Sequence, residues 1–135
     1  MSNASLASEY ATDTMGLVLR LEHRQMSAEA RAIFAAADAG QTIVHIPVMV
    51  FAEILYLSEK GRIGVSMADV DRHLRLFPNY RECPMNYAVI EAASEITDIH
   101  ELHDRLIGAT ARWLKTALIT NDPVIQRSAF VATIW

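Results

Sequence analysis

Two kinds of apolar pattern alternate along the chain, and together they predict its secondary structure. Short apolar or β-branched runs at 9–13, 42–46, 80–83, 117–120 and 130–135 are typical of strands. Stretches with apolar residues three or four positions apart predict helices at 14–25, 28–39, 47–60, 67–77, 85–96 and 101–115, with a brief helix from Pro123. Strands that alternate with helices predict an α/β fold with a mainly parallel central sheet.

Residues at the predicted helix ends support these assignments. Ser27 and Ser66 stand where N-caps are expected, and Pro47 suits the first turn of the helix that follows it. Gly40 and Gly61 stand where helices commonly end, because glycine accepts the left-handed conformation found there.

Composition places the chain among folded globular proteins. Of its 135 residues, 52% are hydrophobic and 21% are charged, which suits one domain with one core. We expect that domain to be residues 5–135, and residues 1–4, MSNA, to be a remnant of cloning. No apolar run reaches about 18 residues and no signal-peptide pattern is present, so a cytoplasmic protein without a membrane segment is expected.

Charge and cysteine content limit the kinds of site and ligand that the chain can have. The single cysteine, Cys83, excludes an internal disulfide and a cysteine-based zinc site. The net charge of −4 weakens a nucleic-acid interpretation without excluding it, because a binding site depends on local charge.

The first chemical signal is a lone carboxylate in an apolar helix. Glu53 is the one charged residue between Ile46 and Leu57, and the positions that share its helix face are apolar. An unpaired buried carboxylate must become protonated or find a cation. We therefore expect Glu53 either to be protonated or to lie beside a positive group.

Three aspartates in other predicted elements are further candidates for residues of a functional site. Asp13 and Asp122 each follow a predicted strand, and ligands in parallel α/β folds gather beyond the carboxyl ends of the strands. Asp104 lies near the start of the helix 101–115, on a face with Gly108, whose place in a helix predicts close packing against another element. If the four carboxylates converge, they form an oxygen-only site that suits Mg²⁺ or Mn²⁺ and phosphoryl chemistry.

Each acid also has a purely structural explanation. Asp13 and Asp122 stand where the following helices need N-caps, and Asp104 complements the dipole of its helix. A buried ion pair with an arginine would account for Glu53.

Two further sets of residues are candidates for supporting roles. His100 and His103 flank Glu101, but two histidines without a third ligand favour roles on the surface or in contact with the ligands of the site rather than as ligands themselves. Six cations are candidates for phosphate contacts on the rim of the site: Arg20, Arg24, Lys60, Arg62, Arg72 and Arg75.

Four segments carry the acids in a familiar order. They are YATDTMGLV with Asp13, HIPVMVFAEIL with Glu53, ELHDRLIGATA with Asp104 and ALITNDPVI with Asp122, and they span nearly the whole chain. In this order and context they resemble the PIN-domain ribonucleases, especially the VapC-type toxins of bacterial toxin–antitoxin pairs. The resemblance implies a three-layer α/β/α sandwich around a mainly parallel sheet.

The same resemblance implies an endoribonuclease that uses Mg²⁺ or Mn²⁺ and leaves a 5′-phosphate and a 3′-hydroxyl. Its catalytic and metal-binding residues would be Asp13, Glu53, Asp104 and Asp122. Thr120 matches a polar residue often found two positions before the last aspartate, and Glu101 stands where many family members carry another aspartate. The implied partners are an RNA substrate, a cognate antitoxin protein and a second copy of the chain in a homodimer.

Two other functions compete with this one. A PIN-like module whose catalysis has decayed would bind only RNA or a partner protein, although the presence of all four acids argues against it. A receiver-type or phosphatase-like domain fits poorly, because both lysines are predicted at helix ends rather than at a strand end.

Overall fold

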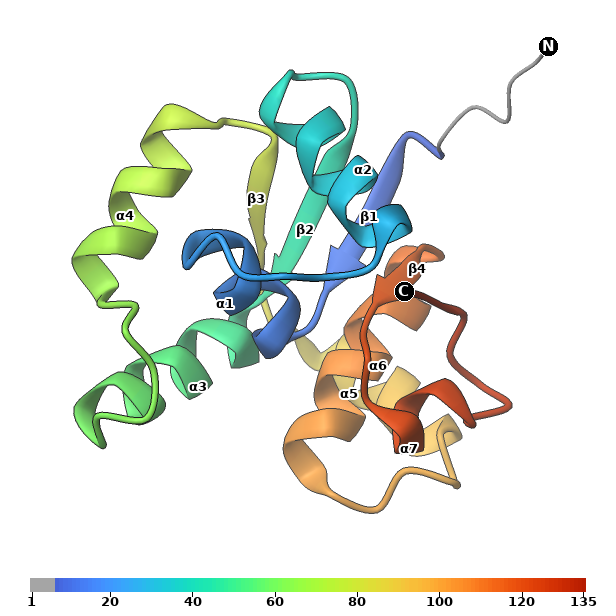
Figure 1. Ribbon diagram of the computed structural model, residues 1–135. Coiled ribbons are helices and arrows are strands. Elements are labelled where there is room, and N and C mark those ends of the chain that lie inside the picture. Colours follow the sequence, from blue (N-terminus) through green and yellow to red (C-terminus); the bar gives the residue numbers. More distant parts are fainter. Residues whose placement is uncertain (1–6) are drawn as a thin grey trace, which may run out of the picture.

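A single five-stranded parallel sheet forms the centre of the protein (Figure 1). The computed structural model describes residues 7–135, so the predicted cloning remnant, residues 1–4, lies outside the described residues. The strands stand in the order β3-β2-β1-β4-β5, with bounds β1 (Glu9–Thr12), β2 (Ile43–Pro47), β3 (Tyr80–Cys83), β4 (Ala117–Ile119) and β5 (Thr133–Ile134). Every neighbouring pair is parallel, which confirms the predicted α/β class.

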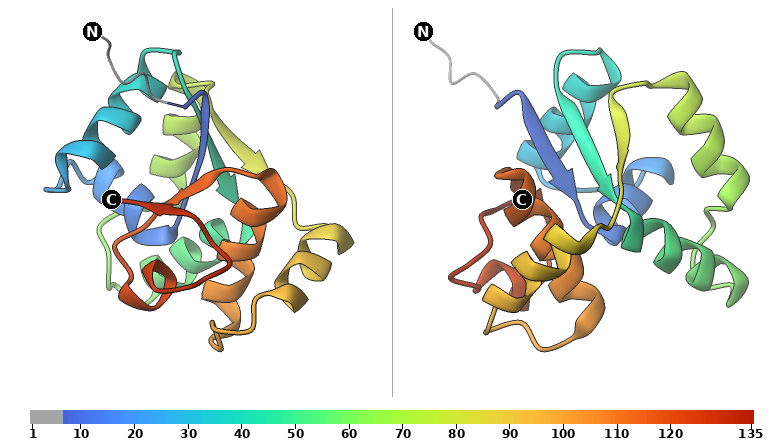
Figure 2. Two further views of the ribbon diagram at one scale, coloured as in Figure 1. Left: turned by 90° about the vertical axis from the view of Figure 1, so that its right-hand side faces the viewer. Right: turned by 180° about the vertical axis from the view of Figure 1, so that it is seen from behind.

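Helices cover both faces of the sheet and give three layers. Their bounds are α1 (Thr14–Leu21), α2 (Ala28–Asp38), α3 (Val48–Glu59), α4 (Met67–Leu76), α5 (Tyr87–Glu95), α6 (Leu102–Leu114) and α7 (Pro123–Gln126). Figure 2 shows α5 and α6 on the opposite side of the sheet from α1 and α2, while α1 contacts α2, α3 and α4. The predicted three-layer α/β/α sandwich is confirmed.

The core fills the space between these layers with side chains from each of them. Leu17 and Phe34 come from α1 and α2, Ile46 and Leu118 from the sheet, and Ile107 from α6, and all five are almost fully buried. Burial of each such side chain contributes about 1.5–3 kcal/mol to folding, so the core holds the strand ends in fixed positions.

Three helix boundaries differ from the predictions in informative ways. The first helix ends at Leu21 rather than at residue 25, and His23 just beyond it takes a left-handed conformation with φ of 54°. Pro47 is the last residue of β2 and the N-cap of α3, rather than the first residue of that helix. Glu101 is likewise the N-cap of α6 rather than its first residue. Helix ends are the least certain part of a sequence prediction, because tertiary contacts decide the last turn.

The apolar helix around Glu53 is less buried than its sequence predicts. Only Val50 and Ile54 of α3 are fully buried, and Leu55 and Tyr56 are exposed, Tyr56 by 53%. Part of the apolar surface of α3 faces outward, where it offers a contact surface instead of core.

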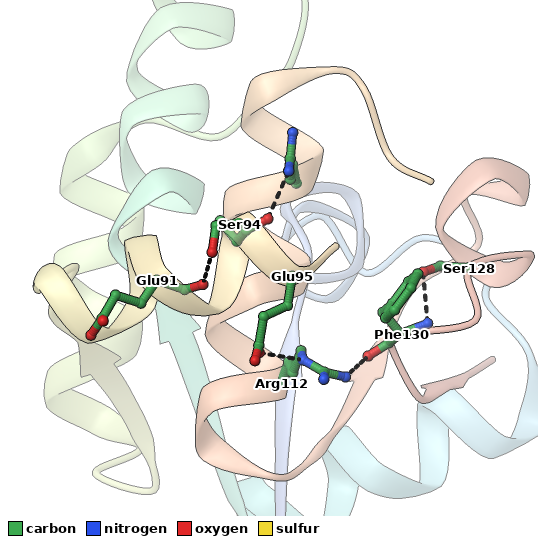
Figure 3. Close-up of polar contacts among 8 residues, drawn as sticks. Glu91, Ser94, Glu95, Arg112, Ser128 and Phe130 are labelled. Atoms are coloured by element: carbon green, nitrogen blue, oxygen red, sulfur yellow. Dashed lines mark hydrogen bonds and ion pairs between the residues drawn. The ribbon is translucent and has the colours of Figure 1, made fainter. Parts of the chain in front are cut away.

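Arg112 of α6 joins α5 and the C-terminal segment (Figure 3). Its Nε donates to Glu95 Oε1 at 3.1 Å, and a second guanidinium nitrogen donates to the carbonyl oxygen of Phe130 at 2.9 Å. This contact holds the segment that leads into β5 against the α5–α6 layer. No helix in the described part of the chain has the length and apolar character needed to cross a membrane.

Candidate active site

Two neighbouring strands bring their carboxyl ends together at one edge of the sheet. β1 pairs with β4 so that Thr12 stands opposite Ile119, and the Asp13 N–H donates to the Ile119 carbonyl oxygen at 3.1 Å. A cavity of about 170 Å³ lies at this edge. It is lined by all four predicted acids, Asp13, Glu53, Asp104 and Asp122, together with Thr14, Met15, Leu57 and Ile107.

Asp13 is the most buried of these acids, with 8% of its surface exposed. Its Oδ1 accepts the N–H of Gly16 at 2.7 Å, which makes it the N-cap of α1. Its Oδ2 accepts the hydroxyl of Thr120 at 2.6 Å. Burial raises the pKa of Asp13 to about 6, although both hydrogen bonds act to lower it.

Thr120 links Asp13 to the second aspartate of this edge. Besides donating to Asp13, its Oγ1 accepts the Asp122 N–H at 3.0 Å. Asp122 in turn caps α7, because its Oδ1 accepts the N–H groups of Val124 and Ile125 at 2.8 and 3.2 Å. The N-cap explanation of both aspartates is correct, and the same caps hold their carboxylates at the cavity.

Glu53 reaches the cavity from α3 and is half-buried, with no arginine partner among the described residues. The Thr14 hydroxyl donates to its Oε1, and His103 Nδ1 lies 3.5 Å from its Oε2. The buried Glu–Arg pair weighed as an alternative is therefore wrong. Thr14 is a contact that sequence reasoning did not assign, and its only signal was adjacency to Asp13. The contact of His103 with Glu53 agrees with one of the two roles expected for the histidines.

The pKa of Asp104 is affected both by burial and by the other acids at the cavity. Burial raises its pKa to about 6, and repulsion from Asp122, Glu101, Glu53 and Asp13 acts in the same direction. Glu101 adds to this repulsion while its Oε1 accepts the Asp104 N–H at 2.9 Å as the cap of α6. Glu101 is outside the set of residues that line the cavity.

The chemistry of these side chains fits a divalent cation. Four carboxylates offer only oxygen ligands, each with free lone pairs beyond the hydrogen bonds described, and a cation would offset the repulsion that raises the Asp104 pKa. Among residues 7–135, no three His, Cys, Asp or Glu side chains already converge closely enough to hold one ion. The acids share a cavity, and they would have to draw inward to coordinate an ion.

The six cations predicted to contact phosphates on the rim of the site do not line its cavity in the described part of the chain. Arg20, Arg24 and Arg72 instead line hollows on the layer formed by α1, α2 and α4.

Comparison with protein families gives one match that covers most of the chain. The family model described as "PIN domain" matches residues 12–131. No curated protein sequence matches the chain.

Solved structures of similar fold come from bacterial complexes. VapBC2 from Rickettsia felis, bound to a DNA fragment from its promoter, superposes with a TM-score of 0.71 at 16% identity, over 94% of this chain and 98% of that one. VapBC from Salmonella typhimurium, bound to DNA, gives 0.70 at 12% identity over 95% and 98%. FitAcB from Neisseria gonorrhoeae gives 0.62 at 18% identity over 93% and 96%. At these identities the likeness concerns the fold.

Proposed function

The chain belongs to the PIN-domain family, and from this premise we propose that it is an endoribonuclease dependent on Mg²⁺ or Mn²⁺. We further propose that it is the toxin of a type II toxin–antitoxin pair, that it works in the cytoplasm, and that residues 5–135 form one domain. The observation that carries the nuclease proposal is the cavity shared by four carboxylates from four different elements.

Each of the four acids would hold the ion: Asp13, Glu53, Asp104 and Asp122. A bound divalent ion supplies Lewis acidity and offsets negative charge on the phosphate during in-line displacement. The protein's own part is to hold the acids in place. The N-caps fix Asp13 and Asp122, Thr120 joins them, and the Thr14 hydroxyl orients Glu53.

The proposed partners follow from the same features. A further structural neighbour, from Klebsiella pneumoniae, is named a toxin–antitoxin complex, so we propose an antitoxin protein that binds this chain. Homodimer formation is supported by exposed apolar side chains on α3 and α5, among them Tyr56, Tyr87 and Ile90.

Cleavage of RNA by the purified protein tests the proposal directly. We expect cleavage with Mg²⁺ or Mn²⁺ and none with EDTA, and we expect Asp13→Asn and Asp104→Asn to reduce the rate about 100-fold or more. Asp71→Asn is the matched control, because Asp71 lies outside the cavity on α4 and forms an exposed pair with Arg75. Cleavage that persists in both cavity variants would refute the assignment.

A stability measurement separates loss of chemistry from loss of folding. The folded-state pKa of Asp104 is raised to about 6, so the folded protein holds this proton more tightly than the unfolded chain does. The resulting contribution to folding stability is present at low pH and is lost as pH rises through 6. At pH 8 without metal, Asp104→Asn should therefore raise the free energy of unfolding in urea by about 1 kcal/mol, allowing for solvent screening. An inactive variant that is also less stable would contradict this explanation.

Wild-type protein that neither cleaves RNA nor binds Mn²⁺ by calorimetry would favour the decayed module.

A further inference from the structure

Helix α1 begins one residue after β1 ends, and a buried glycine, Gly16, stands in its first turn (Figure 1). The glycines with positive φ are Gly40 and Gly61, so the backbone conformation of Gly16 is open to any residue. Alanine favours a helix more than glycine does at such a position. The glycine therefore needs an explanation other than conformational freedom.

The space beside Gly16 is closed on three sides. A Cβ added at residue 16 would lie 2.6 Å from Thr12 Oγ1, 3.0 Å from Asp13 Oδ1 and 3.5 Å from the Ile119 carbonyl oxygen. The third distance is an ordinary van der Waals contact, the second is tight, and the first is shorter than the two atoms can approach. A side chain at this position would therefore collide with the end of β1.

Thr12 has little room to move aside. Its side chain is fully buried at the end of β1, where the residue pairs with Ile119 of β4. Its Oγ1 donates to the Asp13 carbonyl oxygen at 3.1 Å. Rotation of this β-branched side chain would break that hydrogen bond within a closely packed core. A larger residue at position 16 would therefore displace the first turn of α1 rather than Thr12.

The position of that first turn fixes the Asp13 carboxylate. The Gly16 N–H donates to Asp13 Oδ1 at 2.7 Å, and the Thr120 hydroxyl donates to Oδ2 at 2.6 Å. The two hydrogen bonds hold the carboxylate from the α1 side and from the β4 side. If the turn moves away, the hydrogen bond from Gly16 is lost, and the Asp13 carboxylate can rotate about its one remaining bond to Thr120.

We propose that Gly16 is a positioning residue for the carboxylate cavity, because the absence of a side chain lets α1 begin against the ends of β1 and β4 and so holds Asp13 at the cavity. The inference rests on the proposed function, since Asp13 is one of the four acids that would hold the ion. Gly16 has no side chain to offer an ion or a substrate, and it acts through Asp13. A change at Gly16 therefore lowers the affinity for the ion first, and slower cleavage follows from that.

Mn²⁺ binding measured by calorimetry tests the inference without requiring cleavage. We expect Gly16→Ala to bind Mn²⁺ about 10- to 100-fold more weakly than wild type, as when a residue that orients a metal ligand is changed. Gly64→Ala is the matched control and should bind Mn²⁺ like wild type. The Gly64 N–H also donates to a carboxylate, Glu22 Oε2 at 2.7 Å, and a Cβ there would also lie 3.0 Å from that oxygen, but both residues are outside the cavity lining.

A second variant distinguishes positioning from a general loss of packing. Thr12→Ala removes the oxygen that a methyl group at residue 16 would meet first, so α1 can settle back against β1. In the Thr12→Ala background, Gly16→Ala should weaken Mn²⁺ binding by no more than about 3-fold. Urea unfolding without metal identifies which variants are folded. A double variant that folds but binds Mn²⁺ about 10-fold more weakly than Thr12→Ala would overturn the inference, and this holds even if Gly16→Ala alone does not fold.

The same measurements separate this inference from the proposed function. Equal Mn²⁺ affinity in wild type and Gly16→Ala would overturn the inference and leave the nuclease standing. Wild-type protein that binds Mn²⁺ more tightly than Gly16→Ala but cuts no RNA would leave the positioning role standing and refute the nuclease. Wild-type protein that binds no Mn²⁺ would refute the metal site and the positioning role together.

Discussion

At the scale of single residues, the hydroxyl of Thr120 organises the carboxylate cavity. It donates to Asp13 Oδ2 and accepts the Asp122 N–H, so one fully buried oxygen sets the separation of two acids from different strand ends. Removing one partner from such a buried network leaves the remaining groups unsatisfied, which costs about 1–3 kcal/mol.

Thr120→Val tests this role because it keeps the shape of the side chain and removes the hydroxyl. We expect a loss of about 1–3 kcal/mol in the free energy of unfolding and about 10-fold slower RNA cleavage. Thr120→Ser retains the hydroxyl and is expected to keep most of the activity. Urea denaturation and cleavage rates measure both effects, and valine and serine variants that behave alike would show that the hydroxyl is dispensable.

At the scale of elements, Gly108 explains how α6 and the C-terminal segment fit together. A Cβ added at Gly108 would lie 3.0 Å from Val131 Cγ2 and 3.7 Å from Ile99 Cδ1. The close packing predicted from a glycine inside this helix is confirmed. The glycine allows the segment before β5 to approach α6, at a cost of about 1 kcal/mol in helix propensity.

A double-mutant cycle tests that explanation. In the wild-type background, Gly108→Ala gains helix propensity and loses packing against Val131, so its two effects oppose each other. In the Val131→Ala background the space is open, and Gly108→Ala should then be more favourable by about 1 kcal/mol. Equal effects in the two backgrounds, measured by urea unfolding, would show that Val131 does not require the glycine.

At the scale of the whole molecule, an aromatic cluster that contains a histidine packs within the layer of α1, α2 and α4. The His73 ring lies 4.3 Å from the Tyr80 ring and 4.8 Å from the Phe77 ring, measured between centroids. Its Nε2 is buried and has no hydrogen-bond partner among the described residues. Burial, reinforced by the charge of Arg20, lowers the pKa of His73 to about 4.

This histidine should make the fold sensitive to acid. The unfolded chain protonates His73 near pH 6.5 and the folded protein only near 4, so stability present above pH 6.5 is lost as pH falls toward 4, by at most about 3 kcal/mol. Asp13 and Asp104 act in the opposite direction, so the comparison must be between variants. His73→Phe should flatten the fall in unfolding free energy over this range, whereas His100→Gln at an exposed position should not. An identical acid slope in His73→Phe and wild type would contradict this role.

The order of strands and helices, most caps and the arrival of acids at one sheet edge follow from the sequence by itself. These features depend on apolar periodicity and on hydrogen bonds between residues close in the chain, as in the cap formed by Asp13 and Gly16. The parallel order of the strands then carries Asp13 and Asp122 to the same edge.

Only the tertiary structure decided which other side chains meet these acids and where the cations lie. Thr14 meets Glu53 across 39 positions and Thr120 meets Asp13 across 107, and no local pattern encodes such contacts. Helix α3 kept an exposed apolar side, because helix packing against the sheet sets which face each helix turns outward. Local patterns specify elements and their ends, whereas the neighbours of a side chain depend on how those elements pack.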